Sequence, residues 1–215
     1  MILTIISAVL ITTSIWTSYK DFKADKSLLK NAYFKNPIDY LFAVLIAFTV
    51  FTSLAFAYSF NLPGFLKWSW LDLLSSDNQS GGNLIMKPFA SGVISFILLF
   101  WAIMTLALPY LAKGEEKAFR SSVFSQKKRI IESIKFGFIH MIVGVPVIAG
   151  FVLSIVGYIF SVWYIKGYTK AFKEGKAELA DEMGIDRSTS LHAKYNFVII
   201  TFVALIGLLL AVYGK

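Results

Sequence analysis

The chain has 215 residues, of which 57% are apolar and 16% charged, and it contains no cysteine. This composition excludes an ordinary soluble domain, and the lack of cysteine excludes disulfides, thiolate metal sites and a cysteine nucleophile. A formal net charge of +8 would suggest a nucleic-acid partner in a soluble protein, but here the basic residues lie between apolar runs. That pattern is typical of membrane topology, so we expect no nucleic-acid partner.

Six apolar runs are long enough, or nearly so, to cross a bilayer, which takes about 20 residues. Each is expected to be a helix, because backbone exposed to lipid must satisfy its own hydrogen bonds. The runs occupy residues 2–18, 40–60, 91–112, 134–148, 149–165 and 192–213. The sequence therefore predicts an all-α integral membrane protein of about six transmembrane helices, in a single polytopic domain over residues 1–215.

Two N-terminal features are informative, namely the first apolar run and the connection that follows the second run. Residues 1–18 have no positively charged leading region and no small-residue cleavage site, so we expect a retained helix rather than a signal peptide. The connection 61–90 contains Trp68 and Trp70, which are typical of a headgroup interface, and then a polar stretch from Ser75 to Asn83. We expect a short interfacial helix followed by a flexible loop.

The later runs are divided by glycine and proline. Gly144-Val145-Pro146 separates the fourth run from the fifth, and this predicts a tight helical hairpin with short arms. The segment 166–190 mixes acidic and basic residues and is expected to be a solvated surface helix that ends near Gly184.

Basic residues are distributed unequally between the connections. The segments 19–39, 113–133 and 166–190 carry sixteen lysines and arginines, whereas the alternating connections carry only Lys67 and Lys87. This asymmetry places the three basic segments in the cytoplasm and both termini outside. We expect a multi-pass protein of a plasma membrane, and the short chain favours a prokaryotic source.

Polar residues at membrane depth are costly and are therefore candidates for function. Glu115 and Glu116 follow the third run, His140 lies in the fourth, and His192 and Asn196 begin the sixth. The predicted topology brings all three elements into the cytoplasmic half of the membrane. We therefore expect an intramembrane polar cavity that is open to the cytoplasmic side.

Residue spacing separates the roles within this set. Glu116 and Arg120 are four residues apart and can form an ion pair, whereas Glu115 points about 100° away and can face a cavity. His192 and Asn196 are also four apart, so both can donate hydrogen bonds to one developing oxyanion. Pro109 is expected to disrupt the turn before Glu115 and so admit water.

Three ordered motifs carry a family resemblance. Glu-Glu-x-x-x-Arg at 115–120, Phe-x-x-x-His at 136–140 and His-x-x-x-Asn at 192–196 resemble the CPBP family of intramembrane glutamate endopeptidases. That family includes type II CAAX prenyl endopeptidases and the Abi proteins of bacteria, which act in bacteriocin processing and immunity. The resemblance covers a CPBP-like core over 91–215, including Tyr164-Ile165-Lys166-Gly167, whereas the N-terminal helices and outer loop of 1–90 show none.

The resemblance implies an intramembrane glutamate protease that needs no cofactor. Glu115 would activate water with help from His140, while His192 and Asn196 would stabilise the oxyanion. The supporting residues would be Glu116, Arg120 and Phe136. The substrate would be a membrane-bound peptide or protein, cleaved near the cytoplasmic face among membrane lipids.

Two other interpretations remain open at this stage. Glu115, His140 and His192 could supply three zinc ligands with an open fourth position. Alternatively, the chain could be a non-catalytic member of the family, acting as an immunity factor or as an assembly partner in a membrane complex. Members of the family often carry more helices than this chain, and this difference supports the non-catalytic alternative.

Overall fold

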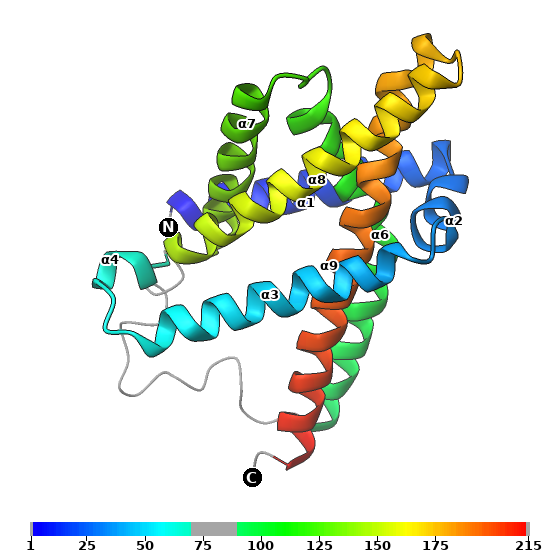
Figure 1. Ribbon diagram of the computed structural model, residues 1–215. Helices are drawn as coiled ribbons and strands as arrows, with labels where there is room; N and C mark the ends of the chain where they lie inside the picture. Colours follow the sequence, from blue (N-terminus) through cyan, green and yellow to red (C-terminus); the bar gives the residue numbers. More distant parts are fainter. Residues whose placement is uncertain (1, 70–89, 214–215) are drawn as a thin grey trace.

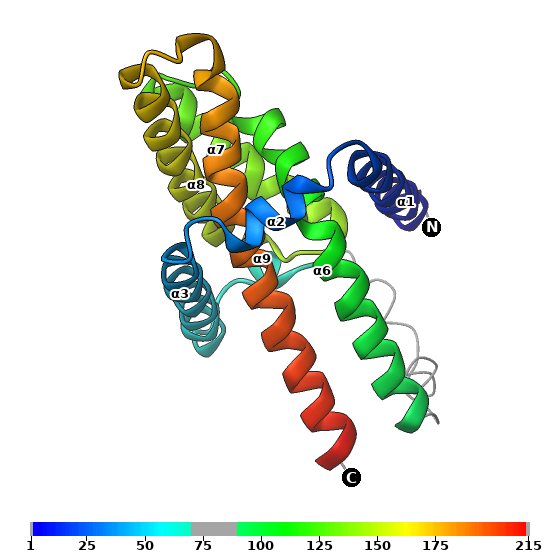
Figure 2. The same ribbon diagram turned by 90° about the vertical axis from the view of Figure 1, so that its right-hand side faces the viewer.

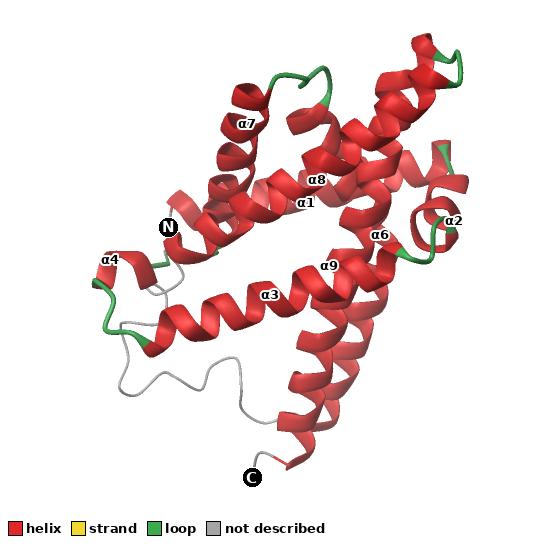
Figure 3. Ribbon diagram, viewed as in Figure 1, coloured by secondary structure: helices red, strands yellow, loops and turns green. Residues whose placement is uncertain are grey.

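A computed structural model describes residues 2–69 and 90–213, and within these residues every regular element is helical (Figure 3). The prediction of an all-α protein is confirmed. In chain order the elements are α1 (Ile2–Ala24), α2 (Ser27–Phe34), α3 (Asp39–Ser59), α4 (Gly64–Lys67), α6 (Ala90–Arg120), α7 (Gln126–Ile139), the 3-10 helix η1 (His140–Val143), α8 (Val147–Lys173), the 3-10 helix η2 (Ala177–Leu179) and α9 (Ala180–Tyr213).

Four of the described helical stretches are long and apolar enough to cross a membrane, which indicates a membrane-embedded protein. They are Asp39–Ser59, Ile94–Arg120, Val147–Lys173 and Ala177–Tyr213. The run predicted over 134–148 is divided between the end of α7, η1 and the turn after it. At 1.5 Å per residue, the 14 residues of α7 extend only about 21 Å, short of the roughly 30 Å of a bilayer core. The expected six spans are thus confirmed only as these four.

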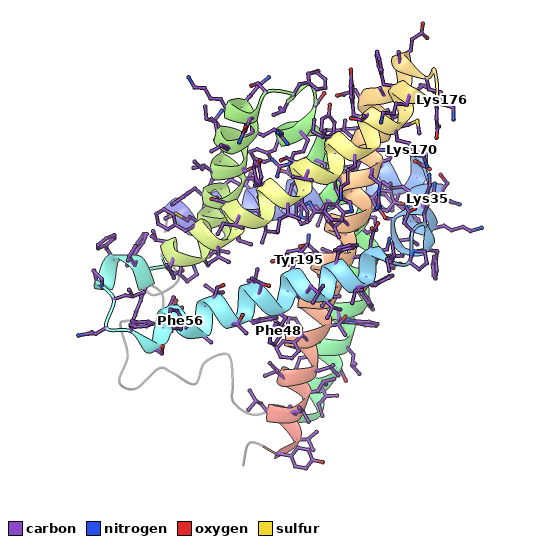
Figure 4. All side chains as sticks on the ribbon, viewed as in Figure 1. Lys35, Phe48, Phe56, Lys170, Lys176 and Tyr195 are labelled. Atoms are coloured by element: carbon purple, nitrogen blue, oxygen red, sulfur yellow. The ribbon has the colours of Figure 1, made fainter. Side chains whose placement is uncertain are left out.

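The long helices α6 and α9 run side by side in both views, and α3 and α8 each pack against α9 (Figures 1 and 2). A core cluster forms where α3, α7, α8 and α9 meet, and it includes Phe136, Phe160 and Leu191. The outer face of α3 is apolar and open: Phe48 and Phe56, labelled in Figure 4, are 66% and 67% exposed. Such a face suits contact with lipid.

The predicted hairpin is confirmed at Gly144-Val145-Pro146. Gly144 has a φ of 92°, a conformation that glycine adopts easily, and Pro146 immediately precedes α8. The backbone N–H of Gly144 donates to the carbonyl of Met141 at 3.1 Å, and Ser69 donates to the carbonyl of Gly144 at 2.6 Å. One arm is longer than expected, because α8 contains 27 residues.

The last helix begins earlier than the sequence indicated. α9 starts at Ala180 and continues through Gly184, so the expected helix end at Gly184 is wrong. A Cβ atom at Gly184 would lie 2.7 Å from the Tyr164 ring, and one at Gly167 would lie 2.7 Å from the Met183 carbonyl oxygen. The two glycines therefore allow α8 and α9 to cross closely, and Gly184 does not end a helix.

The segment 166–190 was predicted to be a solvated surface helix, but two of its carboxylates bind residues of other segments. Asp181 accepts hydrogen bonds from the Ser121 hydroxyl at 2.8 Å and the Ser122 N–H at 3.0 Å. Lys113 pairs with Asp186 at 3.0 Å. These contacts tie the end of α6 and the turn after it to the start of α9, so the basic segments 113–133 and 166–190 lie together on one side of the molecule.

A buried charge cluster joins α3 to α9. Arg187 donates to both carboxylate oxygens of Asp39, and Nζ of Lys194 lies 3.9 Å from Oδ2 of Asp39. Lys194 also donates to the carbonyls of Lys35 at 2.6 Å and Asn36 at 3.3 Å. Asn36 has a φ of 55°, a conformation that asparagine tolerates. The cluster was not expected from the sequence, and it fixes the turn that leads into α3.

Pro109 does not disrupt α6, contrary to the sequence prediction, because the helix continues through it to Arg120. A proline at this position leaves the carbonyl of Thr105 without its helical N–H donor. The Tyr33 hydroxyl donates to that carbonyl at 2.6 Å. A side chain of α2 thus replaces the missing backbone hydrogen bond.

The outer connection begins as expected. α4 (Gly64–Lys67) is a short helix, and the exposed Trp68 follows it directly. Trp70 and the polar stretch from Ser75 to Asn83 lie outside the described residues.

Candidate active site

Two neighbouring carboxylates at the end of α6 have different surroundings. The Glu116 side chain is fully buried, and its Oε2 lies 3.5 Å from Nε of the equally buried Arg120. The Glu115 side chain is 37% exposed. The predicted ion pair is confirmed, and so is the separation of Glu115 from it.

His192 lies between these two carboxylates. Its Nδ1 is 2.9 Å from Oε1 of Glu116, and its Nε2 is 3.6 Å from Oε2 of Glu115. An ionised carboxylate accepts hydrogen bonds and has none to donate, so Nδ1–H of His192 donates to Glu116. The opposite ring nitrogen, Nε2, is directed toward Glu115. The imidazole is therefore oriented by the buried carboxylate and presented to the exposed one.

Aromatic rings hold the His192 imidazole from two sides. Phe160 of α8 stacks on it with centroids 4.3 Å apart and planes at 25°, and Phe136 of α7 meets it edge-on at 5.5 Å. Sequence reasoning named Phe136 but missed Phe160, because one aromatic residue in an apolar run gives no signal. Contacts with two rings leave the imidazole little freedom to turn.

Phe136 also covers the buried arginine. The guanidinium carbon of Arg120 lies 5.1 Å from the Phe136 centroid, within the range of a cation–π contact. A Cβ atom at Gly157 would lie 2.7 Å from Cδ1 of Phe136 and 3.1 Å from Nη2 of Arg120. Gly157 therefore makes the space in which these two side chains pack, a role that only the structure reveals.

His140 lies just beyond the end of α7. Its Nδ1 is 2.7 Å from the carbonyl oxygen of Phe136, so Nδ1–H donates to that oxygen. The His140 ring is 4.8 Å from the Phe136 ring. Among the described contacts, none joins His140 to Glu115. The imidazole beside Glu115 is that of His192, whereas the sequence analysis assigned this place to His140.

Asn196 lies one helical turn after His192 on α9 and is half-buried. Within the part of the chain that the structure describes, its side chain forms no hydrogen bond with the other site residues. Both ring nitrogens of His192 face carboxylates. The expected pairing of His192 and Asn196 toward one oxyanion is therefore not seen in this arrangement.

The zinc alternative required Glu115, His140 and His192 to meet. In the described residues, no group of three or more histidine, cysteine, aspartate or glutamate side chains is placed to hold a metal ion. Four cavities lie within the described ranges of the chain, and neither Glu115, His140 nor His192 lines any of these four. The open polar cavity expected from the sequence is not confirmed.

The arrangement has the elements of acid–base chemistry. Oε2 of Glu115 is buried, has no hydrogen-bond partner in the described structure, and lies 3.6 Å from Nε2 of His192. That separation is too long for a direct hydrogen bond. A polar group placed between the two atoms could exchange a proton with either of them. The Glu115 side chain as a whole is 37% exposed, so it lies at the edge of the buried group.

A scan against protein-family models and searches of curated proteins and of solved structures found no match to this chain. The resemblance to the CPBP family accordingly stays a prediction that rests on the three ordered motifs.

Proposed function

We propose that this protein is an intramembrane endopeptidase of the CPBP type, which hydrolyses peptide bonds of membrane-associated peptides or proteins. The observation that carries the proposal is the half-exposed Glu115 carboxylate beside Nε2 of His192, whose opposite nitrogen is held by the buried Glu116. Residues of α6 and α9, which are far apart in the sequence, supply this pair. A neighbouring carboxylate and an oriented imidazole suit general acid–base catalysis.

In the proposed reaction Glu115 takes a proton from a water molecule as its oxygen adds to the peptide carbonyl carbon. The tetrahedral intermediate then collapses, the carbon–nitrogen bond breaks, and the proton passes to the leaving amine. His192 stabilises charge beside Glu115, and the pair of Glu116 and Arg120 keeps its imidazole in place. His192 takes the assisting place beside Glu115 that the family resemblance gave to His140, and the roles of His140 and Asn196 stay predictions from that resemblance.

We further propose that the protein crosses a prokaryotic plasma membrane about six times and works at its cytoplasmic face. Support comes from the basic segments, which gather beside the candidate site through the pair of Lys113 and Asp186. Positively charged connections are retained on the cytoplasmic side.

The test compares protein termini in cells that carry the full-length wild type, Glu115→Gln or Glu178→Gln. Glu178 is an exposed carboxylate in η2 and provides a matched control for the charge change. We expect new N- and C-termini on a membrane-bound protein with the wild type and the control, and their loss with Glu115→Gln. Purified proteins in liposomes should reproduce the cleavage. Identical termini in all three strains would refute the proposal.

A second candidate function is a non-catalytic immunity factor or assembly partner. It is favoured by the complete burial of Glu116, Arg120 and His192, which suits a network that only holds helices together. Co-purification with another membrane protein at fixed stoichiometry, together with a biological effect that survives Glu115→Gln, would select this function over proteolysis.

A further inference from the structure

A cavity of about 250 Å³ lies between α2, α8, α9 and the end of α6, and its lining residues differ from those of the candidate active site. It is on the side where the basic segments gather. Lys35 and Lys170, both in its lining, are labelled at that end of the molecule in Figure 4. None of the candidate catalytic residues contributes to this basic cavity.

Positive charge exceeds negative charge in the lining. The basic side chains are Lys35, Lys113, Lys166, Lys170 and Arg187, and the acidic ones are Asp25 and Asp186. Two of the basic side chains are already paired, Lys113 with Asp186 and Arg187 with Asp39. Lys35, Lys166 and Lys170 remain, and of these only Lys170 approaches a carboxylate, that of Glu174 at 3.9 Å.

The remaining acid in the lining is engaged elsewhere. The Asp25 carboxylate accepts from the hydroxyl of Ser27 and from the backbone N–H groups of Ser27 and Leu28. It therefore caps α2, and its negative charge together with that of Asp186 offsets only part of the charge of the five basic side chains in the lining. The cavity retains an excess of positive charge that an anion would balance.

Thr189 provides an independent sign of a ligand. The residue is 1% exposed and lines the cavity, yet its hydroxyl has no hydrogen-bond partner in the described structure. The adjacent Ser190, by contrast, donates to the carbonyl of Ala32 at 3.2 Å. A buried hydroxyl without a partner costs free energy unless a bound group satisfies it.

We propose that the basic cavity binds a phosphate group, either of an anionic lipid headgroup or of free phosphate. Phosphate offers several oxygens in a tetrahedral arrangement, which can accept from the Thr189 hydroxyl and from two or more lysines together. Lysine ammonium groups bind phosphate as point charges. The proposed site lies at the end of the molecule where headgroups of a cytoplasmic leaflet would be found, and its occupation does not depend on peptide hydrolysis.

Native mass spectrometry of the full-length protein in neutral detergent tests the lipid source, by titration with phosphatidic acid or phosphatidylcholine. Thermal unfolding with inorganic phosphate, compared with chloride at equal ionic strength, tests free phosphate. The variants are Lys166→Gln/Lys170→Gln, Thr189→Val and Thr189→Ser. The control is Lys127→Gln/Lys128→Gln, which removes the same charge from exposed positions of α7 outside the cavity.

We expect the wild type to bind phosphatidic acid more tightly than phosphatidylcholine, or to be stabilised by inorganic phosphate. The measurement that gives a response identifies whether the phosphate comes from a lipid or from solution. Lys166→Gln/Lys170→Gln should weaken binding about tenfold, and Thr189→Val severalfold, because charge-assisted hydrogen bonds are lost. Thr189→Ser keeps the hydroxyl and should bind like the wild type. A null result in both arms would overturn the site. Equal weakening by the α7 control would also overturn it, because general surface charge would then explain the binding.

Discussion

Nδ1 of His192 lies 2.9 Å from Oε1 of Glu116, which in turn faces the Arg120 guanidinium from the same helix. The three side chains are buried together, so each depends on the others for compensation of its charge or polarity. The exposed Glu115 lies at the edge of this group. Stability and activity should therefore be separable, with stability residing in Glu116 and Arg120 and activity in Glu115.

Replacement of Glu116 by glutamine should destabilise the fold. The Arg120 charge would lose its buried counter-ion, which costs about 3–5 kcal/mol of unfolding free energy. Thermal unfolding in detergent measures the effect, with Glu115→Gln as the neighbouring control and little change expected there. The double substitution Glu116→Gln/Arg120→Met should recover part of the loss, because no lone charge remains. An unchanged melting temperature for Glu116→Gln would contradict the buried pair.

Asp39→Asn should also lower stability by about 3–5 kcal/mol, because Arg187 and Lys194 would both lose their common carboxylate. The matched control is Asp186→Asn, whose pair with Lys113 has an Asp186 side chain that is 48% exposed. Exposed pairs contribute about 1 kcal/mol or less. Urea or thermal unfolding of both variants would distinguish them, and equal losses would disprove the buried cluster.

Tyr33 and Pro109 should be coupled energetically. Tyr33→Phe removes the donor to the Thr105 carbonyl and should cost about 1–3 kcal/mol. In Pro109→Ala the new backbone N–H can donate to the same carbonyl. The double variant should therefore lose less stability than the sum of the two single changes predicts, and a double-mutant cycle measures this coupling. Strict additivity would show that the hydroxyl does not replace the helical bond.

Two glycine-to-alanine substitutions should have opposite effects. Gly184→Ala would place a methyl group 2.7 Å from the Tyr164 ring, so α8 and α9 must separate, at a cost of about 1–3 kcal/mol. At Gly114 in α6 a Cβ atom meets nothing within 4 Å, and alanine should stabilise the helix by about 0.5–1 kcal/mol. Thermal unfolding compares them, and a stabilising Gly184→Ala would rule out the close crossing.

Asp25 should contribute stability that depends on pH. The hydrogen bond from the Ser27 hydroxyl, aided by two backbone N–H groups, lowers the pKa of Asp25 below its usual 3.8. A lowered folded pKa means that the contribution is fully present above pH 3.8 and is lost as the pH falls through the folded value.

Asp25→Ala should therefore cost about 1 kcal/mol at pH 7 and at pH 5, as expected for loss of a helix cap. The difference from the wild type should shrink as the pH falls below 3.8 and through the lower folded pKa. Unfolding curves recorded across this range test the sign. A difference that grows on acidification would show that the carboxylate does not cap α2.

The apolar runs and the turn residues were sufficient to predict most of the helices and the hairpin at Gly144-Val145-Pro146. The start of α9 could not be predicted, because Gly184 has the local signature of a helix end and its role depends on a ring from α8. The continuity of α6 depends similarly on Tyr33, a residue of another helix. These errors arise where a distant side chain overrides a local preference.

In the candidate site, the ion pair of Glu116 and Arg120 followed from helical spacing alone. The position of His192 between two carboxylates did not, because its distance from α6 depends on how α6 and α9 pack. Phe160 and Gly157 lie in an apolar run and carry no chemical signal. The sequence therefore identified residues with reactive groups but not the residues that orient them.

The burial of Lys194 beside Asp39 also bears on biogenesis. During synthesis the N-terminal segment with Asp39 emerges before α9, so the carboxylate and the Lys35 and Asn36 carbonyls are already available when the lysine arrives. A shortened gene encoding only residues 90–215 would contain every candidate catalytic residue but would leave this ammonium without a counter-ion in the membrane. We therefore expect that residues 90–215 expressed alone would be less stable than the same residues in the full chain.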